Sequence, residues 1–433
     1  LDATADIVVM PAATLELSGA GTVHYGTPPL EWPDTETKQS VLSSPVDIDS
    51  FGKSVAISGN YAIIGAPYRD ITFGFNEGSA YVFERSSGTW SLDQTLTASD
   101  KSDSDYFGTS VGISGDYAII GANQNDDKGN NCGAAYIYYN SGGSWSAQAK
   151  LYASSPWGGA KFGASASVSG DYAIVGAPYD AFPGIMPGRA YIFKRSGTDW
   201  GVNEGENAYH ESQAIDLQNG ISNDYFGDSV SISGDYALVG AYGVSSNTGK
   251  ACIFSRSGET WGSESGGKYY ANVDITASDG AGGDMFGGNV GISGDYAIVG
   301  AEYEDPGDVP NAGSAYIYER SGASWPEAKK IQASDREQDD YFATSVAISG
   351  DIAIVGAYGV GAYVGSAYIY ERSGGVWGSN QGAYSTQTKK IAASDGASSD
   401  SFGSSVAISG NYSIVGAPGY SSSKGKIYFF EKS

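Results

Sequence analysis

The chain has 433 residues, and its 49 acidic residues outnumber its 24 lysines and arginines to give a formal net charge of −25. A surface this acidic repels nucleic acid and anionic membranes, so we expect neither as a partner. No apolar run has the length that a membrane span needs, and the two cysteines are too few for a disulfide-stabilised or thiol–metal fold.

Residues 1–35 lie outside the repeats that fill the rest of the chain. They contain two runs with strand-like patterns, near residues 6–10 and residues 14–17. Such a segment can add an edge strand, act as a tether, or be donated to a neighbouring subunit. The sequence alone leaves these three alternatives open.

Seven copies of one pattern follow. Each copy opens on Phe-Gly, or on Phe-Ala in the sixth, and the copies recur every 55–64 residues. The opening phenylalanines are Phe51, Phe107, Phe162, Phe226, Phe286, Phe342 and Phe402. A period of this size indicates a repeat architecture in which neighbouring units share a core.

The second copy shows the local structure that each unit is expected to adopt. Residues 107–114 alternate between large and small side chains, which predicts a strand. Gly115 and Asp116 suit a two-residue hairpin turn into a second strand, which is apolar on both faces. Residues 134–139 predict a third strand, and Trp145 opens a fourth.

Four antiparallel strands of this kind make one blade of a β-propeller, and blades arranged radially cover each other's apolar faces. We therefore predict an all-β, seven-bladed propeller over residues 36–433, with residues 1–35 as an N-terminal extension. The last copy stops after its third strand, and residues 36–44 resemble the fourth strand that it lacks. We expect residues 36–44 to complete the last blade and close the ring.

The loops from the second to the third strand all lie at one end of a propeller, here called the top face. They run from seven to eleven residues and differ in sequence from copy to copy, whereas the turns at the opposite, bottom end are nearly identical. Variable loops on a rigid scaffold usually carry binding, and tyrosines beside carboxylates suit sugar rings or a protein surface. The candidate ligand-binding residues are Tyr68, Asp70, Asp126, Asp127, Tyr179, Asp180, Tyr303 and Asp305. The alternative is that they are ordinary turn residues.

Pairs of aspartates five residues apart recur in the connections between copies. Examples are Asp100 with Asp105, Asp279 with Asp284, Asp335 with Asp340, and Asp395 with Asp400. Such carboxylates can form a ring of cation sites, or they can accept hydrogen bonds from backbone NH groups of the turn. Recurrence in most copies favours the structural role, because a structural device recurs with the scaffold. The sequence therefore identifies no metal ligands and leaves calcium open as a cofactor.

Copies three, four and six contain an insertion near the outer strand. The distance from Trp to the next Phe is 25 or 26 residues in these copies and 17 in copies one, two and five. We expect these copies to carry longer outer hairpins. These are candidate contacts to a neighbour, and decoration of the scaffold is favoured over a binding site.

The seven copies together resemble the FG-GAP repeat of the integrin α-chain propeller, in its compact microbial form. The complete motif, from Phe-Gly to Gly-Ala-Pro, stands at residues 51–67, 162–178 and 402–418. The resemblance implies a secreted or cell-surface propeller that acts in adhesion or ligand binding and not in catalysis. Integrin repeats often carry a calcium loop between the first two strands. Here that connection is only Ser-Gly-Asp or Ser-Gly-Asn, so the calcium site is not carried over.

Our hypothesis from the sequence is an extracellular propeller that binds a glycan or protein through its top loops. The alternative is a structural subunit of a fibre or coat that self-associates through residues 1–35. A polysaccharide-acting enzyme has the least support, because His24 and His210 lie in no motif and the chain has no nucleophile elbow or phosphate-binding loop.

Overall fold

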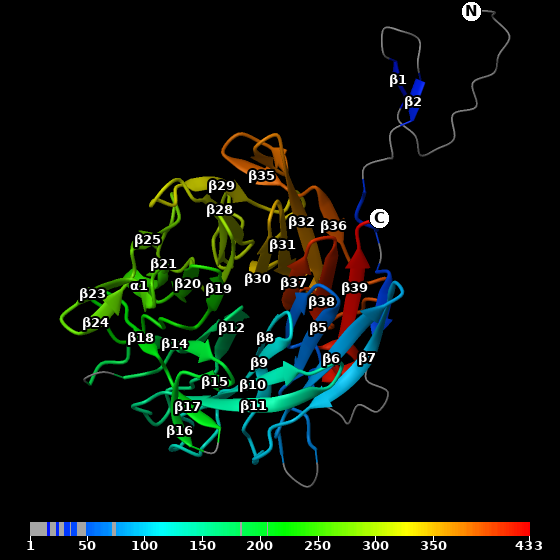
Figure 1. Ribbon diagram of the computed structural model, residues 1–433. Coiled ribbons are helices and arrows are strands. Elements are labelled where there is room, and N and C mark those ends of the chain that lie inside the picture. The colour runs from blue at the N-terminus through cyan, green and yellow to red at the C-terminus, as the bar shows by residue number, and fades with distance from the viewer. Residues whose placement is uncertain are drawn as a thin grey trace, which may run out of the picture.

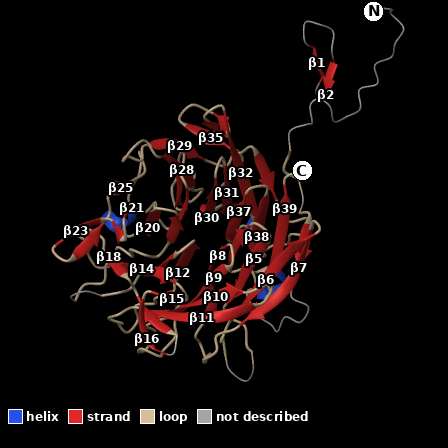
Figure 2. Cartoon of the chain, in the orientation of Figure 1, coloured by secondary structure: helices blue, strands red, loops and turns tan. Residues whose placement is uncertain are grey.

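A computed structural model describes residues 15–17, 23–25, 30–34, 36–40, 49–71, 75–181, 184–205 and 207–433. Seven blades, mostly of four antiparallel strands, are arranged radially as a β-propeller (Figure 1). Strands dominate the described part, and its helices are three single turns (Figure 2). The predicted all-β, seven-bladed fold is therefore confirmed.

The first four blades are built from consecutive segments of the chain. Blade 1 holds β4 (Ser54–Ser58), β5 (Tyr61–Ala66), β6 (Ser79–Ser86) and β7 (Thr89–Leu96). Blade 2 holds β8 (Phe107–Ser114), β9 (Tyr117–Ala122), β10 (Ala134–Asn140) and β11 (Trp145–Tyr152). Blade 3 holds β12 (Ser165–Ser169), β13 (Tyr172–Ala177), β14 (Arg189–Ser196), and β15 (Asp199–Trp200) with β18 (Gln213–Ile215). Blade 4 holds β19 (Val230–Ser233), β20 (Tyr236–Ala241), β21 (Lys250–Ser257), and β22 (Thr260–Trp261) with β25 (Val273–Ile275).

The last three blades follow the same order. Blade 5 holds β26 (Asn289–Ser293), β27 (Tyr296–Ala301), β28 (Ser314–Glu319) and β29 (Glu327–Ile331). Blade 6 holds β30 (Phe342–Ser349), β31 (Ile352–Ala357), β32 (Ser366–Ser373), and β33 (Val376–Trp377) with β36 (Lys389–Ile391). Blade 7 holds β37 (Ser405–Ser409), β38 (Tyr412–Ala417), β39 (Lys426–Glu431) and, from the other end of the chain, β3 (Lys38–Ser40).

The strand from the N-terminal part completes blade 7 as predicted. β3 pairs antiparallel with β39, with Lys38 opposite Phe429. The segment before it also packs on the propeller, because Trp32 is buried in the cluster between blades 6 and 7. Residues 41–44 of the expected strand lie outside the described residues.

Two further N-terminal strands form a hairpin of their own. β1 (Leu15–Leu17) pairs antiparallel with β2 (Val23–Tyr25), and the two make a separate two-stranded sheet. β1 coincides with the run expected at residues 14–17. The run expected at residues 6–10 lies outside the described residues.

Seven hydrophobic clusters hold the blades together, one at each interface between neighbouring blades. One of them joins the last blade to the first, with Phe51 and Ile64 packed against Ile414 and Phe429. A four-stranded sheet with two apolar faces cannot bury both alone, so each blade is stabilised by its two neighbours.

A ring of hydrogen bonds near the bottom turns explains the repeated Ser-Gly pair. In every blade the glycine NH of this turn donates to the serine hydroxyl of the preceding blade, at 3.1–3.4 Å. The bond from Gly59 to Ser409 links blade 1 to blade 7. The short turn is thus constrained twice, by its own hairpin and by its neighbour.

The glycines of Phe-Gly and Gly-Ala are required by the close approach of adjacent blades. A Cβ added to Gly65 in β5 would lie 2.0 Å from the carbonyl oxygen of Gly108 in the next blade. Gly108 itself has φ +97°, which disfavours any residue with a Cβ. The two motif glycines therefore meet at the interface between blades, and the motif reflects the close packing of neighbouring blades.

The outer hairpins expected in copies three, four and six are present. β16 (Val202–Gly205) and β17 (Ala208–His210) extend blade 2, where β17 pairs parallel with β11. β34 (Ser379–Asn380) and β35 (Tyr384–Thr386) extend blade 5 through β29 in the same way. β23 (Ser263–Ser265) and β24 (Lys268–Tyr270) form a separate hairpin in blade 4. Two of the three insertions thus cover the outer edge of the preceding blade.

Three of the top loops share one conformation, although their sequences differ. The shorter loops of blades 4, 6 and 7 contain the single turns α1 (Val244–Asn247), α2 (Val360–Tyr363) and α3 (Tyr420–Ser423). Structural variety on the top face therefore comes from blades 1, 2, 3 and 5, whose loops are longer. None of the helices in the described segments is long and apolar enough to cross a membrane.

Candidate functional site

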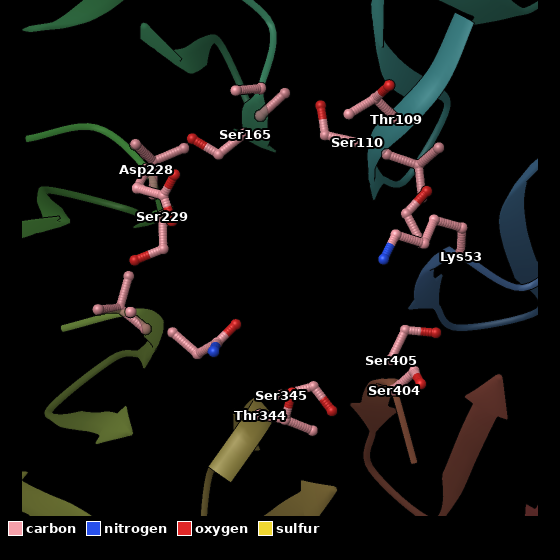
Figure 3. Close-up of a pocket in the computed structure, with 18 of the residues that line it drawn as sticks. Lys53, Thr109, Ser110, Ser165, Asp228, Ser229, Thr344, Ser345, Ser404 and Ser405 are labelled. Carbon is pink, nitrogen blue, oxygen red and sulfur yellow. The ribbon is translucent and has the colours of Figure 1, made fainter. Parts of the chain in front are cut away.

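The candidate site is the top mouth of the central channel. The first strands of the blades surround a cavity of about 840 Å³, and side chains from different blades point into it (Figure 3). The residues at the start of these strands, just after each Phe-Gly, line its wall. A radial arrangement of seven strands thus brings together residues that lie far apart in the sequence.

Most of this wall is neutral, and one serine hydroxyl in each of six blades is already hydrogen-bonded. In six blades a serine hydroxyl donates to a glycine carbonyl oxygen of the next blade, at 2.7–2.9 Å. These bonds run from Ser54 to Gly108, Ser110 to Gly163, Ser165 to Gly227, Ser229 to Gly287, Ser345 to Gly403, and Ser405 to Gly52. The serines therefore fasten blade to blade, which leaves the other side chains of the wall to make contacts with a ligand.

Four charged residues break this neutral wall: Lys53, Lys161, Asp228 and Glu302. Lys53 and Asp228 extend into the channel from opposite sides (Figure 3). Burial among the strands raises the pKa of Asp228 to about 6, and Glu302 adds to the shift while Lys161 opposes it. Burial also raises the pKa of Glu302, against the influence of Thr344 and Lys53. The mouth therefore carries two carboxylates that ionise less readily than usual.

Tyrosines gather around the same mouth. The predicted residues Tyr68, Tyr179 and Tyr303 each line a cavity there, from blades 1, 3 and 5. Tyr68 and Tyr179 leave 38% and 36% of their surface exposed. Each of the three packs edge-on against the tyrosine that precedes the next Phe, with ring centroids 5.3–5.6 Å apart. The structure thus brings these predicted tyrosines together on one face.

The partner tyrosines of these pairs are held in an uncommon backbone conformation. They are Tyr106, Tyr225 and Tyr341, the residues immediately before Phe-Gly or Phe-Ala. The residue at this position has φ between 49° and 58° in all seven blades, although none of the seven is glycine. A side chain there costs backbone strain, which the packing of the blade must offset. Their rings pack against Tyr68, Tyr179 and Tyr303, and they were not among the residues predicted from the sequence.

None of the predicted aspartates is among the residues that line the three cavities at the channel mouth. Asp70, Asp126 and Asp305 each accept a hydrogen bond from a backbone NH five or six residues further along the same loop. Asp127 pairs with Lys150, and the buried Asp180 accepts a hydrogen bond from Tyr191. Each of these carboxylates thus has a structural partner that orders its loop.

The repeated aspartate pairs also have partners within the chain. The second member accepts a hydrogen bond from a backbone NH three residues earlier, as in Asp105, Asp284, Asp340 and Asp400. The first member pairs with a lysine ammonium. These pairs are Asp100 with Lys150, Asp279 with Lys330, Asp335 with Lys390, and Asp395 with Lys426.

The lysines take the place that a bound cation would have beside these carboxylates. Burial favours the neutral acid, but hydrogen bonds from the paired lysine and a tyrosine outweigh it and lower the pKa of Asp100, Asp279 and Asp395. Over the described ranges, no group of three or more His, Cys, Asp or Glu side chains is placed to hold a metal ion. The expected turn-capping role is observed for the second aspartate of each pair, whereas the first aspartate forms an ion pair with a lysine.

The charged residues of the channel were not among the residues predicted from the sequence. The signal was present, because Lys53 and Asp228 are the only charged residues that directly follow Phe-Gly, and Glu302 is the only charged residue that directly follows the Gly-Ala at the end of a second strand. In the sequence these positions look like part of a uniform scaffold, since nothing local shows that they face a common channel.

Comparison with known proteins agrees with this architecture. A scan against protein-family models matches the FG-GAP repeat seven times, over well over half of the chain, at residues 45–83, 90–138, 145–193, 211–254, 271–318, 325–370 and 385–430. A search of the curated proteins finds no match. FG-GAP repeats are found in integrin-like adhesion and binding propellers, a fold that typically serves binding or structure and not catalysis. From its seven matched repeats and its seven-bladed propeller, this chain belongs to the FG-GAP repeat family.

Proposed function

We propose that this protein is an extracellular or cell-surface binding propeller that recognises a glycan or a protein through the top mouth of its channel. The observation that carries the proposal is the group of partly exposed tyrosines around this mouth, beside the channel carboxylates and lysines. Rings with one free face and fixed polar groups nearby suit sugar rings and protein hot spots. The membership of the FG-GAP family supports binding as the general activity.

The test is the loss of binding when the tyrosines are removed together. The triple variant Tyr68→Ala, Tyr179→Ala and Tyr303→Ala is screened with the parent protein on a glycan array and on fixed cells. We expect the ligand bound by the parent to be lost. A control variant replaces three exposed apolar residues of the outer strands, Leu92, Val202 and Val376, by alanine. Equal binding by the parent and the tyrosine variant would refute the proposal for this face.

A second candidate function is assembly through the N-terminal part, with residues 1–35 as an extension of the propeller at 36–433. The observation that favours it is the hairpin of β1 and β2, which forms a sheet separate from the blades. Because Trp32 is buried against the last blades, the test removes residues 1–29 and keeps this contact. An assembly role predicts that the parent self-associates in sizing experiments and that the truncated chain is a folded monomer. A monomeric parent would refute it.

A further inference from the structure

A smaller pocket opens beside the channel mouth between blades 4 and 5, with a volume of about 380 Å³. We call it the blade 4–5 pocket. It is lined by Asp228, Tyr242, Met285, Gly288, Asn289, Glu302 and Tyr303. It therefore combines two carboxylates, one amide and two aromatic rings in a space large enough for a small ligand.

The repeat departs from its own pattern at this pocket. In the other six blades the position of Asn289 is a serine whose hydroxyl bonds to the next blade. The Asn289 side chain makes no such bond in the described part of the chain, and its neighbour across the interface is Ala343 where the other blades have glycine. The preceding residue, Gly288, has no side chain to fill the space. Blade 5 therefore lacks a hydrogen bond that the other six blades form at the equivalent position. A departure of this kind from a repeated structural pattern is typical of a functional site.

The pocket carries negative charge without a cation in its lining. Burial raises the pKa of both Asp228 and Glu302, and Glu302 raises the pKa of Asp228 further. Asp228 accepts no hydrogen bond from the described residues. The two lysines of the channel lie outside this pocket, and Lys161 stands over the ring of Tyr179, 4.7 Å from its centroid. A ligand that carries a positive charge would satisfy both carboxylates.

The other groups that line the pocket suit a ligand that is larger than an ammonium ion. Tyr242 is stacked on Tyr225 with centroids 4.8 Å apart, so one of its faces is covered. Tyr303 and Tyr341 pack in an edge-to-face arrangement, at 69°, so this contact covers at most one face of the Tyr303 ring. The amide of Asn289 can both donate to and accept from hydroxyl groups. The pocket therefore suits a ring with several hydroxyls in addition to a charge.

We propose that the blade 4–5 pocket binds a hexosamine residue with a free amino group, as found in a deacetylated glycan. The ammonium group lies between Asp228 and Glu302, Asn289 bonds to a ring hydroxyl, and the sugar face packs on Tyr303. This inference rests on the proposed function, since it names the glycan class that the top mouth takes.

The test is calorimetric titration of the full chain with a β-1,4-linked glucosamine trimer at pH 6.5. Three comparison ligands are its N-acetylated form, the corresponding glucose trimer and lysine amide. We expect the glucosamine trimer to bind at least about tenfold more tightly than each of the three, because only it offers both the charge and the sugar ring. No measurable binding, equal binding of the glucose trimer, or tighter binding of lysine amide would overturn the proposal.

Variants separate a role in binding from a role in folding. Asp228→Asn is expected to weaken glucosamine trimer binding at least about tenfold. Asp308→Asn is the matched control, since it removes the same charge from an exposed position with φ +63° in the loop that carries Tyr303. The double variant Asn289→Ser with Ala343→Gly rebuilds the pattern of the other blades. We expect it to unfold no earlier than the parent and to lose trimer affinity. Unchanged affinity in both pocket variants would refute the site.

The two proposals can fail separately. In one outcome, the tyrosine triple variant no longer binds a ligand found on the array, and the parent protein does not bind the glucosamine trimer. The proposed function then stands and the hexosamine assignment is wrong. If the trimer binds and the array ligand is unaffected by the tyrosine changes, the pocket stands and the wider binding face is wrong.

Discussion

Replacement of Lys330 by methionine is the sharpest test of how the top loops are held. The Lys330 ammonium lies 2.7 Å from Asp279 and 2.5 Å from Glu304, and the side chains of Lys330 and Glu304 are each 10% exposed. Methionine keeps most of the alkyl chain and removes the charge. Glu304 then stays buried beside Asp279 without a counter-ion.

The expected cost follows from which carboxylate can reach water. Removal of one partner of a buried ion pair costs about 3–5 kcal/mol. Asp279 is 51% exposed and can regain water, so we expect the lower end, about 3 kcal/mol of unfolding free energy. Lys390→Met is the matched control, because Lys390 and Lys330 lie opposite equivalent tyrosines, Tyr368 and Tyr316. Lys390 pairs with an exposed aspartate at the surface, so its loss should cost about 0.5 kcal/mol.

The pH dependence gives an independent check. Lys330 lowers the pKa of Asp279 against the effect of burial, so this carboxylate stabilises the fold above its unfolded pKa and stops doing so as the pH falls through the folded value. Burial raises the pKa of Glu304, and Lys330 opposes that rise. Without the lysine both carboxyls take up protons more readily, and protonation removes the penalty. The destabilisation of Lys330→Met should therefore be full at pH 7.5 and shrink towards pH 4.5.

Equilibrium urea unfolding, followed by tryptophan fluorescence at pH 7.5, 6 and 4.5, measures these quantities. Adding Glu304→Gln to Lys330→Met should recover more than half of the lost stability, because it removes the buried uncompensated charge. Equal destabilisation by Lys330→Met and Lys390→Met, or a loss that does not change with pH, would refute the reasoning.

Three further predictions concern the blade interface, the channel and metal binding. Gly65→Ala should lower the unfolding free energy by at least about 3 kcal/mol in urea titrations, because its Cβ would meet a carbonyl oxygen at 2.0 Å. The control Gly59→Ala, at a position with φ +58° and open space, should cost about 1 kcal/mol. Similar losses in the two variants would contradict the packing argument. Asp228→Asn should stabilise the protein at pH 7.5, because the raised pKa of Asp228 means that folding disfavours its ionised form and that stability falls as the pH rises through about 6. The rise in the pKa of Asp228 corresponds to at most about 3 kcal/mol of unfolding free energy, and screening by water in the channel reduces the expected gain in stability to about 1 kcal/mol. A gain in stability that persists at pH 4.5 would contradict this cause. A chelator should leave the thermal midpoint unchanged in calorimetry, since lysines already neutralise the repeated aspartates; a drop of several degrees would reveal a bound ion.

The strands of the blades could be predicted because their signals are local and repeated. The alternation in residues 107–114, the turn at Gly115 and Asp116, and Trp145 at the start of the fourth strand all reappear as β8, β9 and β11. The missing fourth strand of the last copy predicted the pairing of β3 with β39. The turn-capping role of the second aspartates was also predictable, since it depends on atoms three residues apart.

The candidate site could be predicted only in part. Tyr68, Tyr179 and Tyr303 were chosen as aromatic residues in variable loops, and they do lie at the channel mouth. The aspartates beside them in the sequence instead serve their own loops, as with Asp70 and Asp305. Chemical type alone cannot tell a loop-ordering carboxylate from a ligand-binding one.

The sequence by itself determined the number of blades, the strands within them and the family, because strand alternation, tight turns and close glycine contacts are written into each copy. Only the tertiary structure decided which residues share the channel mouth. Lys53, Asp228, Asn289 and Glu302 come from three blades and acquire a common environment only when those blades stand around one axis. The physical reason is that burial, pKa and charge balance depend on neighbours that are distant in the chain, and a local pattern carries no record of them.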